Sequence, residues 1–115
     1  MSEAIIVMVT CGNSAEAEAI ANELLAERLV ACVNIAGRIR SLFHWQGAVA
    51  RESESLLLMK TRRDRFEQLS KRVKELHSYE VPEIIAMPVI VGNPDYLDWI
   101  EGSTAPQQQG ESELT

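Results

Sequence analysis

The residues best suited to chemistry in this sequence stand together at positions 77–85, in the run His-Ser-Tyr-Glu-Val-Pro-Glu-Ile-Ile. This run brings an imidazole, a phenol and carboxylates close together along the chain. Histidine and glutamate bind metal ions or hold protons, so the run predicts a site. A rigid turn in which Pro82 starts a strand is the other interpretation of the same residues.

The hydrophobic pattern predicts the elements that would position this run. Residues from Ala4 to Thr10 are almost continuously apolar, which is typical of a buried strand. Asn13 and Glu16 then resemble a capping box at the start of a helix. The elements expected in chain order are strands over 4–10, from 30 to 45, over 48–60 and over 83–91, and helices over 14–29, from 61 and from 94.

Several local signals mark the ends of these elements. Thr61-x-x-Asp64 predicts an N-cap for the second helix, and Asn93 followed by a proline predicts the start of the last one. Pro88 within the fourth strand predicts a bulge or an edge position. From Gly102 onwards the composition becomes polar. We therefore expect one domain over 1–102 and a disordered polar tail over 103–115.

The predicted element order is β-α-β-β-α-β with an added C-terminal helix. This is the ferredoxin-like split βαβ pattern, an α+β fold with an antiparallel sheet and a central hairpin. In that topology the first strand, the second helix and the hairpin turn all end at one rim of the sheet. The residues expected toward this rim are Cys11, Asn13, His44, Trp45, His77, Tyr79 and Glu83.

His77 is the strongest candidate metal ligand, and Cys11 and Glu83 are the further candidate ligands. Imidazole and thiolate suit Cu or Zn better than carboxylates do. The alternatives are an exposed histidine that complements the helix dipole and an inert, half-buried thiol. Glu83 either binds the ion or accepts a hydrogen bond from Tyr79 or a neighbouring chain. Cys32 lies in the middle of a strand pattern and is predicted to belong to the core.

The central hairpin is predicted to extend beyond the helices that cover the sheet. A strand of a dozen residues spans about 40 Å, whereas a helix of about sixteen residues covers about 24 Å. The far part of the hairpin carries Leu42, Phe43 and Trp45. Such exposed apolar residues predict self-association, and the alternative is a hairpin that curls back over its own sheet. Glu54 and Lys60 share a strand face about 20 Å apart, so each needs a partner on another strand or subunit.

The composition excludes several other classes of protein. The chain has 115 residues and a net charge of −6, without the basic face of a nucleic-acid-binding protein. No apolar run reaches the length needed to span a membrane, and no basic region precedes one as in a signal peptide. The two cysteines are therefore expected to be free thiols in the cytoplasm. Because no nucleophile–base constellation is visible, we expect no enzymatic activity.

Three segments resemble the CutA family of divalent-cation tolerance proteins. They are 27–35 (ERLVACVNI), 79–84 (YEVPEI) and 92–99 (GNPDYLDW), and the resemblance runs from about Ile5 to Ile100. It implies a ferredoxin-like fold assembled as a trimer, an association with copper binding, and no established enzymatic reaction. The positions that match the family motifs are Cys32, Trp45, Glu54, Lys60, Tyr79, Pro82 and Glu83.

The resemblance also implies roles for individual residues. Family members often have His-Pro-Tyr where this chain has His77-Ser78-Tyr79. Some carry two adjacent histidines there, the first of which is Leu76 in this chain, together with a cysteine near the place of Cys11. The implied metal ligands are His77, Cys11 and Glu83, and the implied inter-subunit or cleft positions are Trp45, Glu54, Lys60 and Tyr79.

We therefore expect a cytoplasmic homotrimer for divalent metal tolerance. It would bind copper or a similar divalent cation and would require no cofactor, nucleic acid or membrane. Two other functions remain open. A small-molecule sensor resembling the nitrogen-regulatory trimers would bind a nucleotide or another metabolite saturably. A scaffolding trimer would bind neither metals nor metabolites.

Overall fold

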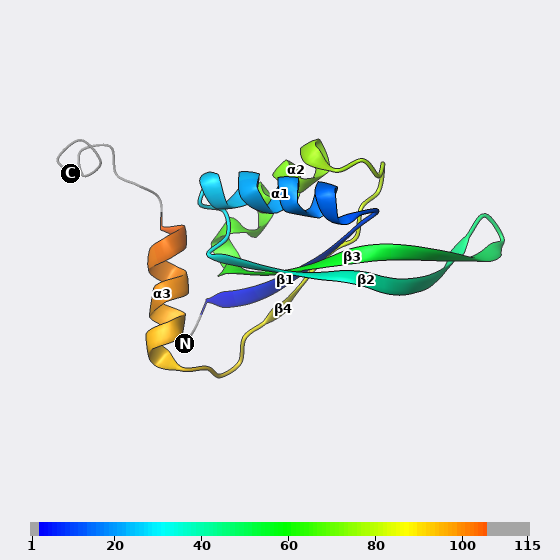
Figure 1. Ribbon diagram of the computed structural model, residues 1–115. Coiled ribbons are helices and arrows are strands. Elements are labelled where there is room, and N and C mark those ends of the chain that lie inside the picture. The colour runs from blue at the N-terminus through cyan, green and yellow to red at the C-terminus, as the bar shows by residue number, and fades with distance from the viewer. Residues whose placement is uncertain (1–2, 106–115) are drawn as a thin grey trace.

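The chain forms one four-stranded antiparallel sheet, covered on one face by two helices (Figure 1). The computed structural model describes residues 3–105. The elements are β1 (Ala4–Cys11), α1 (Ser14–Ala26), β2 (Cys32–Trp45), β3 (Ala48–Arg62), a short 3₁₀ helix (Arg63–Arg65), α2 (Phe66–Leu76), β4 (Ile84–Pro88) and α3 (Pro94–Thr104). The predicted α+β element order is confirmed.

The strand order in the sheet is β2-β3-β1-β4. The central strand β1 pairs with β3 along its whole length, ending with Cys11 opposite Ser55. On its other side β1 pairs with β4, which forms an edge of the sheet. Pro88 lies at the end of this edge strand, as predicted, where its missing N–H costs no internal hydrogen bond of the sheet.

The core lies between the sheet and the pair α1 and α2. Alternate residues of β1 point toward the helices, and Val7, Val9 and Cys11 on this face are fully buried. The buried cluster comprises Ile5, Val7, Val9, Cys11, Ala17, Ile20, Leu24, Leu29, Val30, Leu57, Met59, Leu69 and Val73. Cys11 therefore sits at the end of the apolar core, next to the helix termini.

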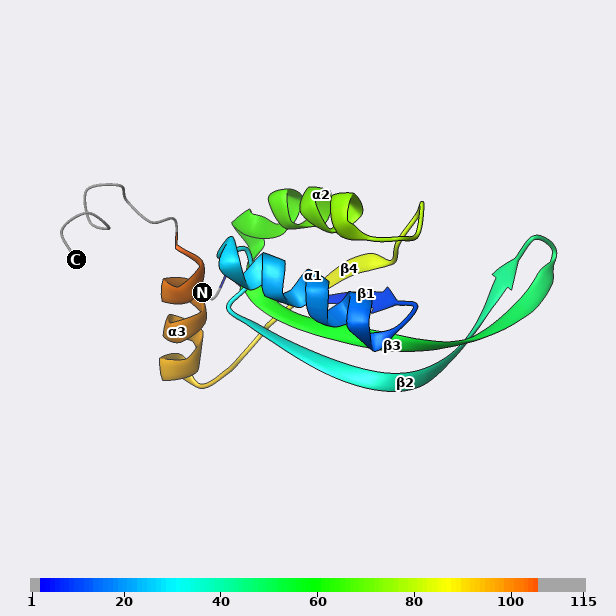
Figure 2. The same cartoon turned by 45° about the horizontal axis from the view of Figure 1, so that its top comes forward.

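β2 and β3 continue beyond the rest of the sheet as a two-stranded extension. Because β1 ends opposite Ser55, residues 48–54 of β3 pair with β2 alone. The pairing register shifts between Ala36 and Ile39, where Arg38 has a φ of 57°, and such a bulge bends a strand. The molecule measures 55 × 31 × 22 Å, and Figure 2 shows the hairpin projecting past the helices instead of curling back over the sheet.

Some predicted element boundaries are wrong. Helix α1 ends three residues before Leu29, because Arg28 takes a left-handed φ of 58° that turns Leu29 into the core. Thr61 does not cap a helix, since it lies in β3 and its hydroxyl donates to the carbonyl of Leu29 at 2.7 Å. The fourth strand is shorter than the 83–91 that the apolar pattern predicts.

Helix α3 lies at the end of the sheet opposite the hairpin tip (Figure 1). It begins as predicted, with the side chain of Asn93 accepting from the N–H of Asp95 at 3.0 Å. It continues to Thr104, past the predicted domain end at 102, and Arg62 donates to both the hydroxyl and the carbonyl of that residue. Of the predicted tail over 103–115, the part from 106 onwards lies outside the described residues. None of the described helices combines the length and hydropathy needed to cross a bilayer.

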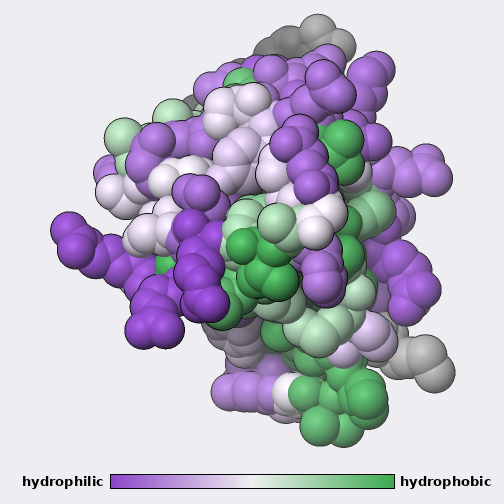
Figure 3. Space-filling model, turned by 90° about the vertical axis from the view of Figure 1, so that its right-hand side faces the viewer, coloured by the Kyte–Doolittle hydropathy of each residue, from purple (hydrophilic) through white to green (hydrophobic). Residues whose placement is uncertain are grey.

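The sheet face turned away from α1 and α2 carries exposed apolar side chains. Ile85 and Met87 of β4 lie on this face and are 52% and 47% exposed. The hairpin extension carries Leu42, Trp45 and Val49, all more than half exposed, with Trp45 on the opposite strand face from the other two. Figure 3, which looks onto the hairpin end, shows hydrophobic residues gathered in the lower half, on the side away from α1 and α2. Exposed apolar side chains gathered in this way are typical of an interaction surface.

Candidate metal centre

Three side chains that commonly ligate metals converge where the core meets the helix ends. Cys11 ends β1, Glu16 lies in the first turn of α1, and His77 follows α2 directly. The Cys11 sulfur, a carboxylate oxygen of Glu16 and a ring nitrogen of His77 all lie within 4.8 Å of one another. We call these three residues the Cys–Glu–His cluster. Within residues 3–105 no second group of three such side chains comes together.

Hydrogen bonds hold the His77 ring through both nitrogens. Nδ1 accepts from the backbone N–H of Tyr79 at 3.0 Å, and Nε2 lies 2.7 Å from the carbonyl oxygen of Thr10. Because a carbonyl can only accept, we assign the ring proton to Nε2. The side chain of His77 is completely buried. The interpretation of His77 as an exposed helix-end histidine is therefore wrong.

Glu16 presents two oxygens in different situations. Its Oε2 accepts from the backbone N–H of Ser78 at 2.7 Å, whereas Oε1 is buried and has no hydrogen-bond partner among the residues that the structure describes. Burial opposes ionisation of this carboxyl, but the hydrogen bonds from Ser78, together with smaller contributions from His77 and the backbone of Gly12, lower the pKa of Glu16 below its ordinary value. The cluster therefore contains a carboxylate with one unsatisfied oxygen.

Cys11 is a buried thiol close to negative charges. It follows Val7 and Val9 on the helix side of β1, which is the side that faces the cluster. Burial, followed by the charges of Glu16 and Glu54, raises the pKa of the Cys11 thiol to about 12. The same carboxylates that oppose a free thiolate favour a bound cation.

Tyr79 links the cluster to the base of the hairpin. Its hydroxyl donates to Oε2 of Glu54 at 2.8 Å, and its ring lies 4.7 Å from that of His77. Burial and the contact with Glu54 raise the pKa of the Tyr79 phenol to about 12. Glu54 itself is only 7% exposed. The predicted partner of Glu54 is therefore found on another segment of the same chain.

The structure divides the predicted rim residues between two places. Cys11, His77 and Tyr79 come together, but His44 and Trp45 lie at the tip of the hairpin extension, where Trp45 is 62% exposed. The length of β3 beyond β1, residues 48–54, corresponds to about 23 Å of extended chain. Neither hairpin residue can therefore reach the cluster from this arrangement.

Glu16 occupies the place that sequence assigned to Glu83. Glu83 is exposed and does not belong to the group of three converging ligands. Asn13 does cap α1, accepting from the N–H of Glu16 at 2.8 Å, but the Glu16 side chain turns to Ser78 instead of completing a capping box. A carboxylate in the first helical turn after a strand ending in cysteine is the sequence signal for this ligand.

Lys60 and Cys32 meet on the other face of the sheet, near α3. The Lys60 ammonium donates to the side chain of Asn34 and lies 3.9 Å from the Cys32 sulfur. Lys60 therefore also has a partner on a neighbouring strand. Cys32 is only half-buried and stands outside the core cluster, contrary to prediction, because its strand position faces away from α1 and α2.

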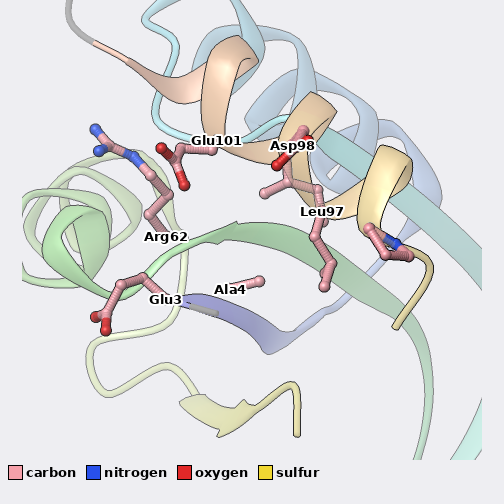
Figure 4. A pocket seen from close by; sticks show the side chains of 8 residues that line it. Glu3, Ala4, Arg62, Leu97, Asp98 and Glu101 are labelled. Carbon is pink, nitrogen blue, oxygen red and sulfur yellow. The ribbon is translucent and has the colours of Figure 1, made fainter. Parts of the chain in front are cut away.

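A separate shallow pocket of about 240 Å³ lies between α3 and the ends of β1 and β3. Figure 4 shows Leu97 and Asp98 of α3 across from Arg62 and Ala4. Arg62 is already bonded to Thr104 and lies 3.4 Å from Asp64, so its charge is not free for a ligand. Neither a cysteine nor a histidine is among the residues that line this pocket, so it lacks the soft metal ligands of the Cys–Glu–His cluster.

Relatives of known name share this sequence over most of its length. The divalent-cation tolerance protein CutA of Thermus thermophilus is 46% identical over 99 residues, covering 86% of this chain and 96% of the relative. The chloroplastic protein CutA of Arabidopsis thaliana is 43% identical over 100 residues, covering 87% of this chain and 55% of the relative.

Solved structures that resemble this chain carry the same family name as these relatives. The Thermus thermophilus divalent cation tolerance protein (Cut A1) matches with a TM-score of 0.87 and 45% identity, covering 89% of this chain and 99% of the other. CutA1 of Oryza sativa matches with a TM-score of 0.88 and 40% identity, covering 90% and 95%. The family model described as CutA1 divalent ion tolerance protein matches residues 5–103, so this chain belongs to the CutA1 family.

Proposed function

We propose that this chain is a homotrimeric divalent-cation tolerance protein that binds Cu or Zn at Cys11, Glu16 and His77. The observation that carries the proposal is the Glu16 carboxylate: its buried Oε1 has no hydrogen-bond partner among residues 3–105, and one of its oxygens lies within 4.8 Å of a thiol sulfur and an imidazole nitrogen. A buried oxygen without a donor is costly in a native protein, and a cation would satisfy it.

The chemistry of the donors supports the same ion class. Thiolate and imidazole select Cu and Zn over harder ions such as Mg²⁺ and Ca²⁺. Metal-ligating histidines usually donate their other ring N–H to a carbonyl, which is the contact His77 makes with Thr10. Three protein ligands leave room for further ligands from solvent, and the Cys11 proton must leave before the sulfur can bind. We therefore expect modest, pH-dependent affinity.

Titration with Cu²⁺ and Zn²⁺ tests the ligand assignment. Cys11→Ser, Glu16→Gln and His77→Ala should each weaken binding about 10-fold or more, as loss of a metal ligand or of its support usually does. Cys32→Ser and His44→Ala are matched controls, because they remove the same donor types elsewhere in the chain. The sequence analysis favoured Glu83 as a ligand, but the Glu83→Gln variant should bind the metal as the wild type does. Binding that ignores the first three changes contradicts the proposal.

The exposed apolar surface supports a self-associating protein. Ile85 and Met87 continue the sheet face away from the helices, and the hairpin extension places Leu42 and Trp45 beyond the rest of the domain. A closed symmetric assembly buries such surface on every copy. Trp45, Glu54, Lys60 and Tyr79 remain our candidates for inter-subunit or cleft positions.

Native mass spectrometry with and without Cu and Zn tests assembly and metal binding together. We expect three chains per particle and one ion per chain. A monomeric mass at micromolar concentration contradicts the trimer and leaves the metal proposal intact. The cytoplasm remains the location that we propose, since both cysteines are free thiols.

A further inference from the structure

The hydrogen bonds around His77 leave its ring without a free lone pair. Nε2 carries the proton that it donates to Thr10, and the lone pair of Nδ1 is occupied by the N–H of Tyr79 at 3.0 Å. Nδ1 is the nitrogen that faces the cluster, since it lies 4.0 Å from Oε2 of Glu16. His77 can therefore ligate an ion within the cluster only after the amide of Tyr79 has moved away.

We propose that the hydrogen bond between the Tyr79 hydroxyl and Glu54 is a latch that limits metal affinity and couples the Cys–Glu–His cluster to the base of the hairpin. The proposal rests on the proposed function, because it concerns how the same cluster becomes available. The closed connector, residues 77–79, competes with the ion for His77. Releasing the connector frees Nδ1.

Contacts with three neighbouring segments keep the connector closed. Ser78 donates its N–H to Glu16 at 2.7 Å, and Tyr79 donates its hydroxyl to Glu54 at 2.8 Å. The Tyr79 ring also lies against Gly12, where an added Cβ would come within 3.4 Å of the hydroxyl oxygen. The Tyr79 hydroxyl is the side-chain donor that reaches the hairpin base, and it can be removed without altering the backbone.

Glu54 stands where the hairpin leaves the sheet. It pairs with Ile39, the first pair beyond the register shift, and its neighbour Ser55 is the first residue of β3 that pairs with β1. When Tyr79 moves away, the buried Glu54 carboxylate loses the only hydrogen-bond donor found for it among the described residues. Water must then reach this carboxylate, so metal binding should loosen the hairpin base.

Thermodynamic linkage gives the direction of the effect. A contact present only in the closed form lowers the apparent affinity of a ligand that needs the open form, and removing the contact raises it. Tyr79→Phe keeps the ring over Gly12 but leaves Glu54 buried without its donor in the closed form. We expect this variant to bind Zn²⁺ about 10-fold more tightly than the wild type, as a lost hydrogen bond to a charged group allows.

The chain supplies a matched control in Tyr96, its other tyrosine, which lies on α3 and stacks on Trp99. Zn²⁺ dissociation constants are measured for wild type, Tyr79→Phe and Tyr96→Phe at one pH. Tyr96→Phe should bind as the wild type does. Equal or weaker binding by a folded Tyr79→Phe variant of unchanged oligomeric state overturns the latch.

Hydrogen exchange of the wild-type protein provides a second measurement that needs no variant. Saturating Zn²⁺ should speed exchange of the Tyr79 amide and of amides around Ile39 and Glu54. Unchanged exchange at these amides overturns the latch, even if Tyr79→Phe does not fold. Zn²⁺ binding that ignores both Cys11→Ser and His77→Ala overturns the proposed function and the latch together. Binding that needs Cys11 and His77 but not the Tyr79 hydroxyl overturns the latch alone.

Discussion

The carbonyl oxygen of Thr10 lies 2.7 Å from Nε2 of His77, although the two residues are 67 positions apart in the chain. The central strand thus fixes the orientation of an imidazole that arrives from the end of α2. No side-chain partner is needed to set which nitrogen carries the proton. This arrangement ties the candidate metal centre to the most protected strand of the sheet.

Stability should fall at alkaline pH because of Cys11 and Tyr79. Both have pKa values raised to about 12 in the folded state, from ordinary values of 9.0 and 10.0. The unfolded chain therefore releases these protons first, and the stabilisation present below pH 9.0 is lost as the pH rises toward 12. Urea unfolding at several pH values should give a shallower alkaline decline for Cys11→Ala and Tyr79→Phe. Identical slopes in all three proteins would contradict the prediction.

Stability should also fall at acidic pH, because of Glu16. Its pKa is lowered from 4.5 in the folded state, so its contribution is present above pH 4.5 and disappears as the pH falls through the folded value. Glu16→Gln should therefore destabilise the protein at neutral pH but not in strong acid. Unfolding midpoints compared between pH 7 and pH 3 measure this convergence. A constant difference across the range would show that ionisation of Glu16 is not its cause.

Ile85→Arg should dissociate the proposed trimer. The change places a charge on the apolar sheet face while leaving the core between sheet and helices intact. Leu25→Arg is the control, because Leu25 is a 40% exposed apolar residue on α1, away from that face. Sedimentation equilibrium should give a reduced mass for Ile85→Arg alone. Equal masses for both variants and the wild type would place the interface elsewhere.

Leu69→Ala should destabilise the fold by about 2–5 kcal/mol, the usual loss for a fully buried leucine. Leu69 lies on the inner face of α2 and is completely buried. Lys71→Ala, on the exposed face of the same helix, should change the free energy of unfolding by less than about 0.5 kcal/mol. Denaturant titration at one fixed protein concentration measures both, so that mass action contributes equally to the proteins compared.

The fold was predictable because its signals are local and periodic. The continuous apolar run in β1, the spacing of Leu69 and Val73 in α2, and the Asn93 cap each identify an element without knowledge of its neighbours. The predicted end of α1 was wrong because a single residue after the helix takes an unusual backbone conformation. Arg28, with its left-handed φ, gives no sequence signal as a glycine would.

The candidate site was only partly predictable, because its geometry depends on side-chain directions. His77 and Cys11 were identified by type, and topology placed them at one end of the sheet. Glu16 was interpreted as a capping residue, and only the path of the connector shows that its carboxylate turns to Ser78. The predicted position of Trp45 near the cluster was wrong for another reason. A strand pattern predicts the length of a strand but not where the neighbouring strand ends.

The two tryptophans of the chain lie at opposite ends of the elongated molecule. Trp45 ends β2 at the hairpin tip, and Trp99 stacks on Tyr96 in α3 with ring centroids 5.5 Å apart. Trp99→Phe would therefore leave Trp45, at the tip, as the single tryptophan of the chain. A solvent-exposed indole that becomes enclosed changes its emission, so mixing experiments could follow subunit exchange in real time without any attached dye.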